Sequence, residues 1–258
     1  MKRRRADSYG LTIAPVVQGR NRDAMVKGPS MATEIVTQGR VPARRTNPLT
    51  AWSLTAGGAL FVVGGAMHPT DDRPDLSMAQ QLKVMYEDPM WYPGHAAMFV
   101  GMVLITAALA ALVRAPGIAV VPRARKATLV TAAASALATV GALLHVVAAT
   151  DADRIGDGDS MPPLSGAYLV LETISVPIFA FGIAALAVIG ALSRTLGNWF
   201  AAVFGVVGGV GYGLAGGTAA FTPVFDFLFP TAIGVGLWTA AVGIGLLRRP
   251  VPTPPTAR

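Results

Sequence analysis

The chain has 258 residues, of which 53% are hydrophobic and only 14% charged, whereas a soluble domain usually has about 25% charged residues. It contains no cysteine, which excludes disulfides, thiolate metal ligands, iron–sulfur clusters and cysteine nucleophiles. The net charge of +7 does not indicate nucleic-acid binding, because the basic residues are concentrated in tails and loops between long uncharged stretches, as a lipid-bilayer protein requires.

Residues 1–47 form a polar, basic tail that begins Met1-Lys2-Arg3-Arg4-Arg5. It has no sustained apolar periodicity, so we expect it to be disordered and cytoplasmic. The tail is too long to be the charged start of an ordinary signal peptide, so we do not expect the first apolar segment to be cleaved. Met25 and Met31 are alternative translation starts.

Six apolar segments follow, each long enough to cross a membrane as a helix, since about 20 helical residues span the hydrocarbon core. They cover approximately residues 49–67, 94–113, 127–149, 166–192, 199–217 and 226–247. The sequence therefore predicts an all-α, polytopic membrane bundle over residues 48–248, followed by a short cytoplasmic tail at 249–258. Glycine and proline crowd the ends of the last two segments, so five spans with one re-entrant segment is the alternative.

The basic residues assign an orientation to these spans. Eighteen of the 21 Lys and Arg residues lie in the N-terminal tail, after the second and fourth spans, or after the last span. The opposite side has only Arg73, Lys83 and Arg154, together with nine acidic residues. The positive-inside rule therefore predicts that both termini are cytoplasmic. We expect a plasma membrane, and the Ala-, Gly- and Arg-rich composition is typical of a bacterium with a GC-rich genome.

The loop between the first two spans, residues 69–93, has the signal of a short surface helix. Ser77 and Gln80 have the spacing of a capping box. An apolar stripe at helical spacing follows, formed by Met78, Leu82 and Met85. We expect this segment to lie flat on the outer surface or over the helix ends, and in the leading hypothesis below the loop acts as a lid.

The second outer loop, residues 150–165, is acidic and contains glycine. It resembles a calcium-binding loop only loosely, because it lacks the twelve-residue spacing and terminal Glu of an EF-hand. Calcium binding is therefore a minor alternative for this loop.

Tryptophans occur at three span ends, at Trp52, Trp91 and Trp199. An amphipathic indole prefers the headgroup level of a membrane, so we expect these three side chains to lie there. Trp238 lies in the middle of a span and must pack against protein or lipid.

The fifth span is rich in glycine. Four glycines recur at every fourth residue and share one face: Gly205, Gly209, Gly213 and Gly217. Small residues let helix backbones approach closely. We expect this face to pack within the bundle, and a homo-oligomer formed through it is the alternative.

All three histidines, and both carboxylates within predicted spans, fall in the outer third of the membrane. His68 ends the first span, His95 begins the second, and His145 lies about one turn inside the third. Glu172 lies one to two turns deep in the fourth span, and Asp226 begins the sixth. Ionisable residues within a membrane are costly and usually mark a functional site.

Helical spacing predicts which way these side chains point. His145 shares a face with three small residues, Ala134, Ala138 and Gly141, which suits close packing inside the bundle. In the fourth span a polar stripe should also face inward, and it comprises Tyr168, Glu172 and Ser175. We therefore expect a hydrogen bond between His145 and Glu172, in which the carboxylate orients the imidazole ring.

Several ligands suit this constellation. His95, Met98 and Met102 share a helix face, and imidazole with thioether is a soft ligand set that suits copper(I). Histidines from two helices could instead hold a haem. Three histidines with a water could hold zinc, with Glu172 as a base, although no HExxH motif supports this. The alternative without a ligand is that these side chains form only interhelical hydrogen bonds.

The leading hypothesis from the sequence is a binding or sensing membrane protein with an outward-facing polar pocket. Its ligand is a metal ion or a small molecule, held by the candidate residues His68, His95, His145, Glu172, Asp226 and Tyr168. A metal-dependent membrane enzyme that uses the same residues is the first alternative. A structural membrane protein without a ligand is the second.

Overall fold

The computed structural model describes residues 47–69, 76–155 and 160–248. Within these ranges the chain is helical without strands, and six helices are long and apolar enough to span a membrane. The expected tails, apart from Asn47 and Arg248, lie outside the described residues. The spans are α1 (Pro48–Ala66), α3 (Trp91–Leu112), α5 (Pro122–Ala148), α6 (Pro163–Ser193), α7 (Trp199–Thr218), and a last span made of η2 (Pro223–Thr231) and α8 (Ala232–Leu247). The predicted fold class and span count are confirmed for this part of the chain.

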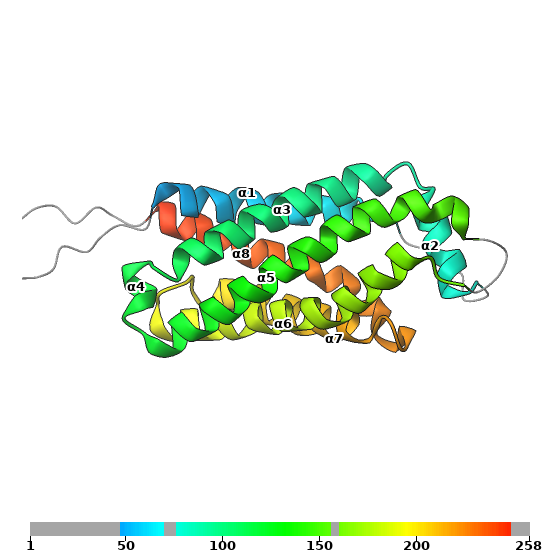
Figure 1. The fold of residues 1–258 in the computed structure, drawn as a ribbon. Coiled ribbons are helices and arrows are strands. Elements are labelled where there is room, and N and C mark those ends of the chain that lie inside the picture. Colours follow the sequence, from blue (N-terminus) through cyan, green and yellow to red (C-terminus); the bar gives the residue numbers. More distant parts are fainter. Residues whose placement is uncertain (1–46, 70–75, 156–159, 249–258) are drawn as a thin grey trace, which may run out of the picture. The chain divides into compact units, whose positions relative to one another are not determined.

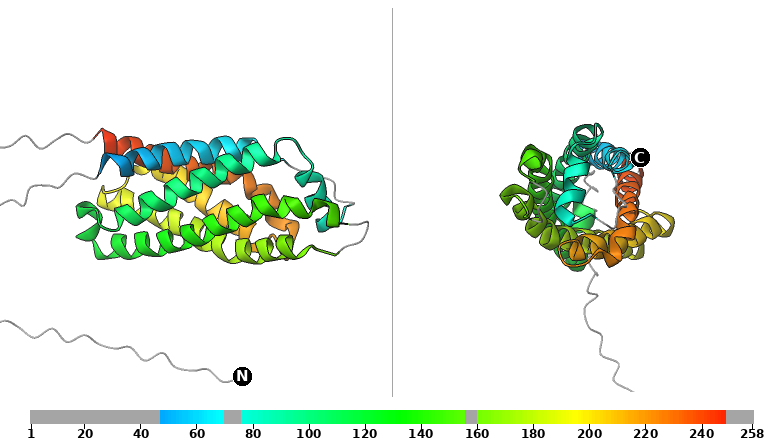
Figure 2. Two further views of the ribbon diagram at one scale, coloured as in Figure 1. Left: turned by 45° about the horizontal axis from the view of Figure 1, so that its top comes forward. Right: turned by 90° about the vertical axis from the view of Figure 1, so that its right-hand side faces the viewer.

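The six spans form a closed ring in which each helix packs against two others. In ring order the helices are α1, α3, α5, α6, α7 and α8, and α8 packs against α1 again. The end-on view in Figure 2 shows this arrangement, and Figure 1 shows the helices running nearly side by side. Because the ring is closed, polar side chains from several spans can face one interior.

Glycines set the closest approaches between the spans. A Cβ at Gly57 of α1 would lie 2.9 Å from the carbonyl oxygen of Gly101 in α3. Elsewhere in the ring, a Cβ at Gly208 of α7 would lie 2.5 Å from the backbone nitrogen of Val235 in α8. Real Cβ atoms do not come so close, so these helix pairs depend on glycine for van der Waals contact between backbones.

The repeated glycines of α7 face the interior of the same chain. A Cβ at Gly209 would meet Ala184 of α6 at 2.9 Å, and one at Gly213 would meet the ring of Phe181. Gly205 packs against Trp238, the tryptophan in the middle of α8. A second copy of the chain could therefore reach this face only by displacing α6, and a homo-oligomer formed there stays a prediction.

The short surface helix exists as α2 (Met78–Tyr86). Ser77 and Gln80 form both hydrogen bonds of the capping box, as the sequence predicted. The buried face differs slightly from the predicted stripe, since Met78 is 40% exposed. The buried side chains of α2 are Ala79, Leu82 and Tyr86, which pack with residues of α5 and of η1 (Ala149–Arg154).

Trp91 is buried in this cluster, and its position at the headgroup level stays a prediction. Its side chain is fully buried, whereas Trp52 and Trp199 are each 58% exposed. Trp91 is buried because a surface layer, formed by α2 and η1, covers it. Tyr86 of α2 contacts the Trp91 ring edge-on, with 4.7 Å between the ring centroids. The hydroxyl of Tyr86 also lies 3.0 Å from that of Ser165 in α6, which ties the surface layer to the bundle.

Several helix boundaries differ from the predicted ones. Proline is favoured in the first helical turn, where it costs no hydrogen bond, and α5 and α6 both begin at a proline. α5 therefore starts at Pro122, five residues earlier than expected, after the short α4 (Pro116–Ala119). The last span starts as a 3₁₀ helix that contains Pro230, a residue that cannot donate a backbone hydrogen bond.

Candidate functional site

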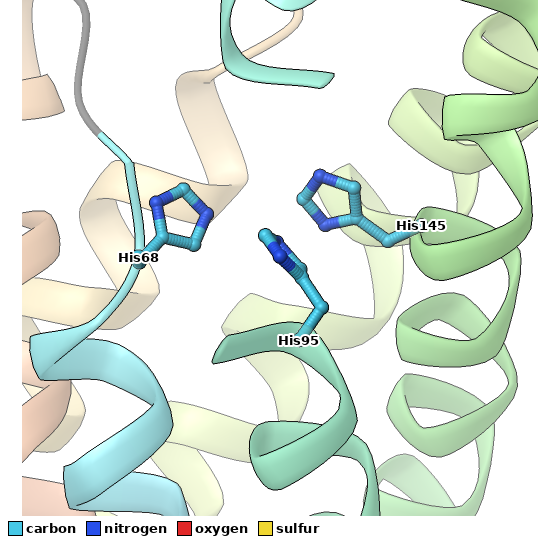
Figure 3. Close-up of side chains that lie close together, drawn as sticks. All are labelled: His68, His95 and His145. Atoms are coloured by element: carbon cyan, nitrogen blue, oxygen red, sulfur yellow. The ribbon is translucent and has the colours of Figure 1, made fainter. Parts of the chain in front are cut away.

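The three histidines come from three different helices and meet at the end of the bundle that carries α2 (Figure 3). His68 follows the last turn of α1, His95 lies in the first turns of α3, and His145 lies near the end of α5. If one ring nitrogen is taken from each histidine, the three nitrogens all lie within 4.8 Å of one another. The predicted gathering of the histidines is therefore confirmed, and the group could hold a metal ion.

Backbone carbonyls fix the proton position on two of these rings. Nδ1 of His68 lies 2.7 Å from the carbonyl oxygen of Pro69, and Nδ1 of His95 lies 2.7 Å from that of Trp91. A carbonyl can only accept a hydrogen bond, so Nδ1 carries the proton in both rings. Nε2 therefore keeps its lone pair, which is the arrangement typical of metal-bound histidine.

Two of the Nε2 atoms lack partners. Nε2 of His95 and Nε2 of His145 are buried and form no hydrogen bond within the described residues. Leaving a buried acceptor unsatisfied costs about 1–3 kcal/mol. Burial also lowers the pKa of His68, against the opposing effect of its hydrogen bond to Pro69. His68 is therefore neutral near pH 7, as a metal ligand must be.

Aromatic rings hold two of the imidazoles in place. The indole of Trp91 stacks on His95 with 3.7 Å between ring centroids and 29° between planes. The phenol of Tyr168, on α6, stacks on His145 at 3.7 Å and 26°. These contacts restrict the rotation of both rings, so the ligand group is preorganised by its neighbours.

A cavity borders the histidines on the interior side of the ring. Its volume is about 60 Å³, measured by the centre of a water-sized sphere, enough for about four waters at 10–15 Å³ each. Its polar lining comprises His95, His145, Tyr168, Glu172, Ser175 and Tyr212, and its apolar lining includes Met98, Met102 and Phe179. Apart from His145, α5 presents only small residues to this space, namely Ala138, Gly141 and Ala142.

The structure brings most of the predicted site residues together. The polar stripe of α6 faces inward as predicted, since Tyr168, Glu172 and Ser175 all line the cavity. Asp226 does not join them, because it lies on η2, is exposed to the surroundings and lines neither the cavity nor the histidine group.

The predicted hydrogen bond between His145 and Glu172 was wrong. Within the described residues Nε2 of His145 has no hydrogen-bond partner, and the face of its ring is covered by Tyr168. The phenol of Tyr168 occupies the space where the carboxylate was expected, and its hydroxyl lies beside the Glu172 carboxyl group. The helix spacing predicted the inward direction of Glu172 correctly but could not exclude an intervening side chain.

The acidic second loop does not show a calcium site in its described part. Asp151 is buried, and one of its carboxylate oxygens lies 2.8 Å from Arg154. Asp151 and Arg154 both belong to η1, so this ion pair stabilises the short helix and does not indicate a calcium ligand. Residues 156–159, which carry Asp157 and Asp159, lie outside the described residues.

Sequence reasoning missed two residues of the site. Trp91 precedes His95 by four residues and so shares its helix face, which was a readable signal. Tyr212 of α7 lines the cavity, and a polar aromatic residue within a glycine-rich span was the signal for it.

Comparison of this chain with protein-family models, with curated proteins and with solved structures found no match. The interpretation of the site therefore depends on its own geometry and chemistry.

Proposed function

We propose that this chain is a metal-binding protein of the bacterial plasma membrane, with a single transition-metal ion held by His68, His95 and His145 near the outer surface. The observation that carries the proposal is the convergence of three imidazoles from three separate spans or span ends, with ligand atoms within 4.8 Å of one another. Tetrahedral coordination at about 2.0–2.1 Å needs nitrogens about 3.4 Å apart, which small side-chain rotations reach.

The energetics also favour an ion. Two of the three imidazoles have a buried Nε2 without a hydrogen bond in the described part of the chain. Native structures rarely leave such groups unsatisfied, and each instance calls for a ligand, water or ion. One ion would satisfy these nitrogens together.

The donor set narrows the choice of metal. Imidazole suits zinc, copper, iron and nickel, whereas calcium and magnesium prefer oxygen ligands. The neighbouring thioethers of Met98 and Met102 line the adjoining cavity and would also tolerate copper(I). We therefore propose zinc or copper as the ion, and the affinity measurement below distinguishes them.

A haem fits the geometry less well than an ion does. A haem takes its two axial imidazoles on opposite faces of a flat macrocycle. Here a third imidazole lies within 4.8 Å of the other two ligand atoms, where the macrocycle would have to pass. Trp91 and Tyr168 also stack directly on His95 and His145.

The test is the affinity of the purified, detergent-solubilised protein for zinc(II) and copper(I), measured by competition with chelators of known affinity. We expect one ion per chain, and we expect His95→Asn to weaken binding by at least about a hundredfold, since it removes one of three ligands. Tyr86→Phe is the matched control, because it removes a buried hydrogen bond in the same region but no ligand. Equal affinities of the His95→Asn variant and the control would contradict the proposal.

A metal-dependent enzyme is the second candidate function, and one observation favours it. The cavity that borders the histidines contains Glu172, and an acidic side chain beside a three-histidine metal site is the arrangement of many metal-dependent hydrolases. If the purified protein bound no metal in this experiment, the remaining interpretation would be a structural membrane protein without a ligand.

A further inference from the structure

The cavity contains more polar groups than the interior of a packed membrane bundle needs. Glu172 and the hydroxyls of Tyr168, Tyr212 and Ser175 line it, next to two imidazoles. Ser175 is fully buried, and its hydroxyl has no hydrogen-bond partner within the described residues. Buried polar groups are almost always hydrogen-bonded, so the cavity requires a polar occupant.

The cavity borders the metal position directly. His95 and His145 line it, while His68 lies on the other side of the group and does not. A metal held by three histidines keeps a fourth coordination position for a ligand that the protein does not supply. The space into which that position can open is the cavity.

We propose that the fourth ligand of the metal enters from this cavity, and that the cavity binds a small neutral Lewis base that carries its own hydrogen, such as water, ammonia or a small amine. This inference rests on the proposed metal site. The lone pair of the ligand binds the metal, and its hydrogen is donated to Glu172 or to a neighbouring hydroxyl.

The two ends of the site select this class of ligand. The metal accepts a lone pair, and Glu172, which is the only carboxylate in the lining, accepts a hydrogen bond. A neutral molecule with one lone pair and one N–H or O–H is attracted by both ends. The volume of about 60 Å³ limits it to a few non-hydrogen atoms, since about four waters would fill the space.

The experiment uses the full chain loaded with cobalt(II), whose visible absorption reports its coordination, and imidazole at pH 8 as the probe. Imidazole is mostly neutral at this pH and offers one lone pair and one N–H. We expect a saturable change in the cobalt spectrum as imidazole is added, at one imidazole per metal.

Filling the cavity tests the route of entry. A Cβ at Gly141 would be in ordinary contact with Leu171 and Ser175, at 3.7 and 3.8 Å, so Gly141→Leu fits at its base and extends into the cavity. Gly245→Leu is the matched control, because a Cβ there meets nothing within 4 Å. We expect Gly141→Leu to bind cobalt as the wild type does but to bind imidazole at least about tenfold more weakly.

Changing the carboxylate tests the hydrogen acceptor. Glu172→Gln should weaken imidazole binding about three- to tenfold, because a charge-assisted hydrogen bond becomes a neutral one. Asp226→Asn is its matched control, since Asp226 is outside the cavity lining and the variant should behave as the wild type.

The outcomes separate this inference from the proposed function. Cobalt binding without a spectral response to imidazole, or equal imidazole affinities of Gly141→Leu and Gly245→Leu, would overturn the inference and leave the metal site intact. Failure of the wild type to bind cobalt, zinc or copper would overturn the proposed function, and this inference with it.

Discussion

His95 is held by two contacts with one residue and leaves its third polar direction free, which is unusual for a histidine that only fills space. Its Nδ1 donates to the carbonyl of Trp91, its ring stacks on the indole of the same residue, and its Nε2 is left without a partner in the described part of the chain. The side chain is 3% exposed. One residue, Trp91, thus sets both the tautomer and the orientation of a proposed ligand.

Replacing the indole tests this positioning role. Trp91→Leu keeps the backbone carbonyl and removes the stacked ring, so we expect metal affinity to fall about tenfold, as for other residues that orient ligands. Trp199→Leu is the control, because Trp199 is 58% exposed and far from the site in sequence. Equal metal affinities of the two variants, measured by chelator competition, would contradict the role assigned to Trp91.

At this scale the sequence predicted directions better than partners. Helical spacing placed His145 and the stripe of Tyr168, Glu172 and Ser175 on inward faces, because a polar stripe toward lipid is costly. Spacing along one helix does not predict which side chain of a neighbouring helix makes the contact. Tyr168 therefore took the position beside His145 that was predicted for Glu172.

Among the elements, α7 shows how glycine controls the distances that shape the cavity. Gly208 faces the backbone of α8 at residues 234–235, and Gly209 faces α6. Such contacts draw α7 close to both neighbours by van der Waals attraction. Tyr212, one turn further along α7, is thereby brought to the cavity.

Adding one methyl group at this contact should weaken the bundle. In Gly208→Ala the new Cβ would lie 2.5 Å from the nitrogen of Val235 and 2.6 Å from the carbonyl carbon of Gly234, so the helices must separate. We expect a loss of about 1–3 kcal/mol in the free energy of unfolding, as for other overpacked contacts. Gly245→Ala, where a Cβ meets nothing within 4 Å, should unfold like the wild type in detergent; an equal loss in both variants would refute this account.

Element boundaries were the part of the fold that the sequence predicted least well. Hydropathy located all six spans and the start of α7, but it missed the first turns of α3, α5 and α6, because those turns contain tryptophan, proline or basic residues. The capping box of Ser77 and Gln80 was predicted correctly, since it depends on local chemistry alone. The burial of Trp91 was not, because it depends on α2 covering that position.

For the whole molecule, the closed ring explains how a polar site can exist within an apolar bundle. All the described acidic and histidine side chains of the proposed site face inward or lie at the α2 end, and the outer surfaces of the spans expose large apolar residues such as Val203 and Leu192. The bilayer thus meets an apolar surface, and the ring of helices keeps the polar groups of the site away from lipid.

The orientation of the ring in the membrane can be tested cleanly because the chain has no cysteine. Thr150→Cys would place one thiol at the α2 end, and Val120→Cys would place one at the opposite end; both positions are exposed. The charge distribution predicts that a membrane-impermeant maleimide labels Thr150→Cys in intact bacterial cells and labels Val120→Cys only after permeabilisation. The reverse pattern would put the histidines on the cytoplasmic side.

The central claim, that three histidines from three spans bind one metal ion, is tested most directly by X-ray absorption spectroscopy of the zinc- or copper-loaded protein. We predict about three imidazole nitrogens at about 2.0–2.1 Å in the first coordination shell, with the multiple scattering that imidazole rings produce. A first shell of water or carboxylate oxygens without imidazole scattering would contradict the claim, because it would place the metal elsewhere on the chain.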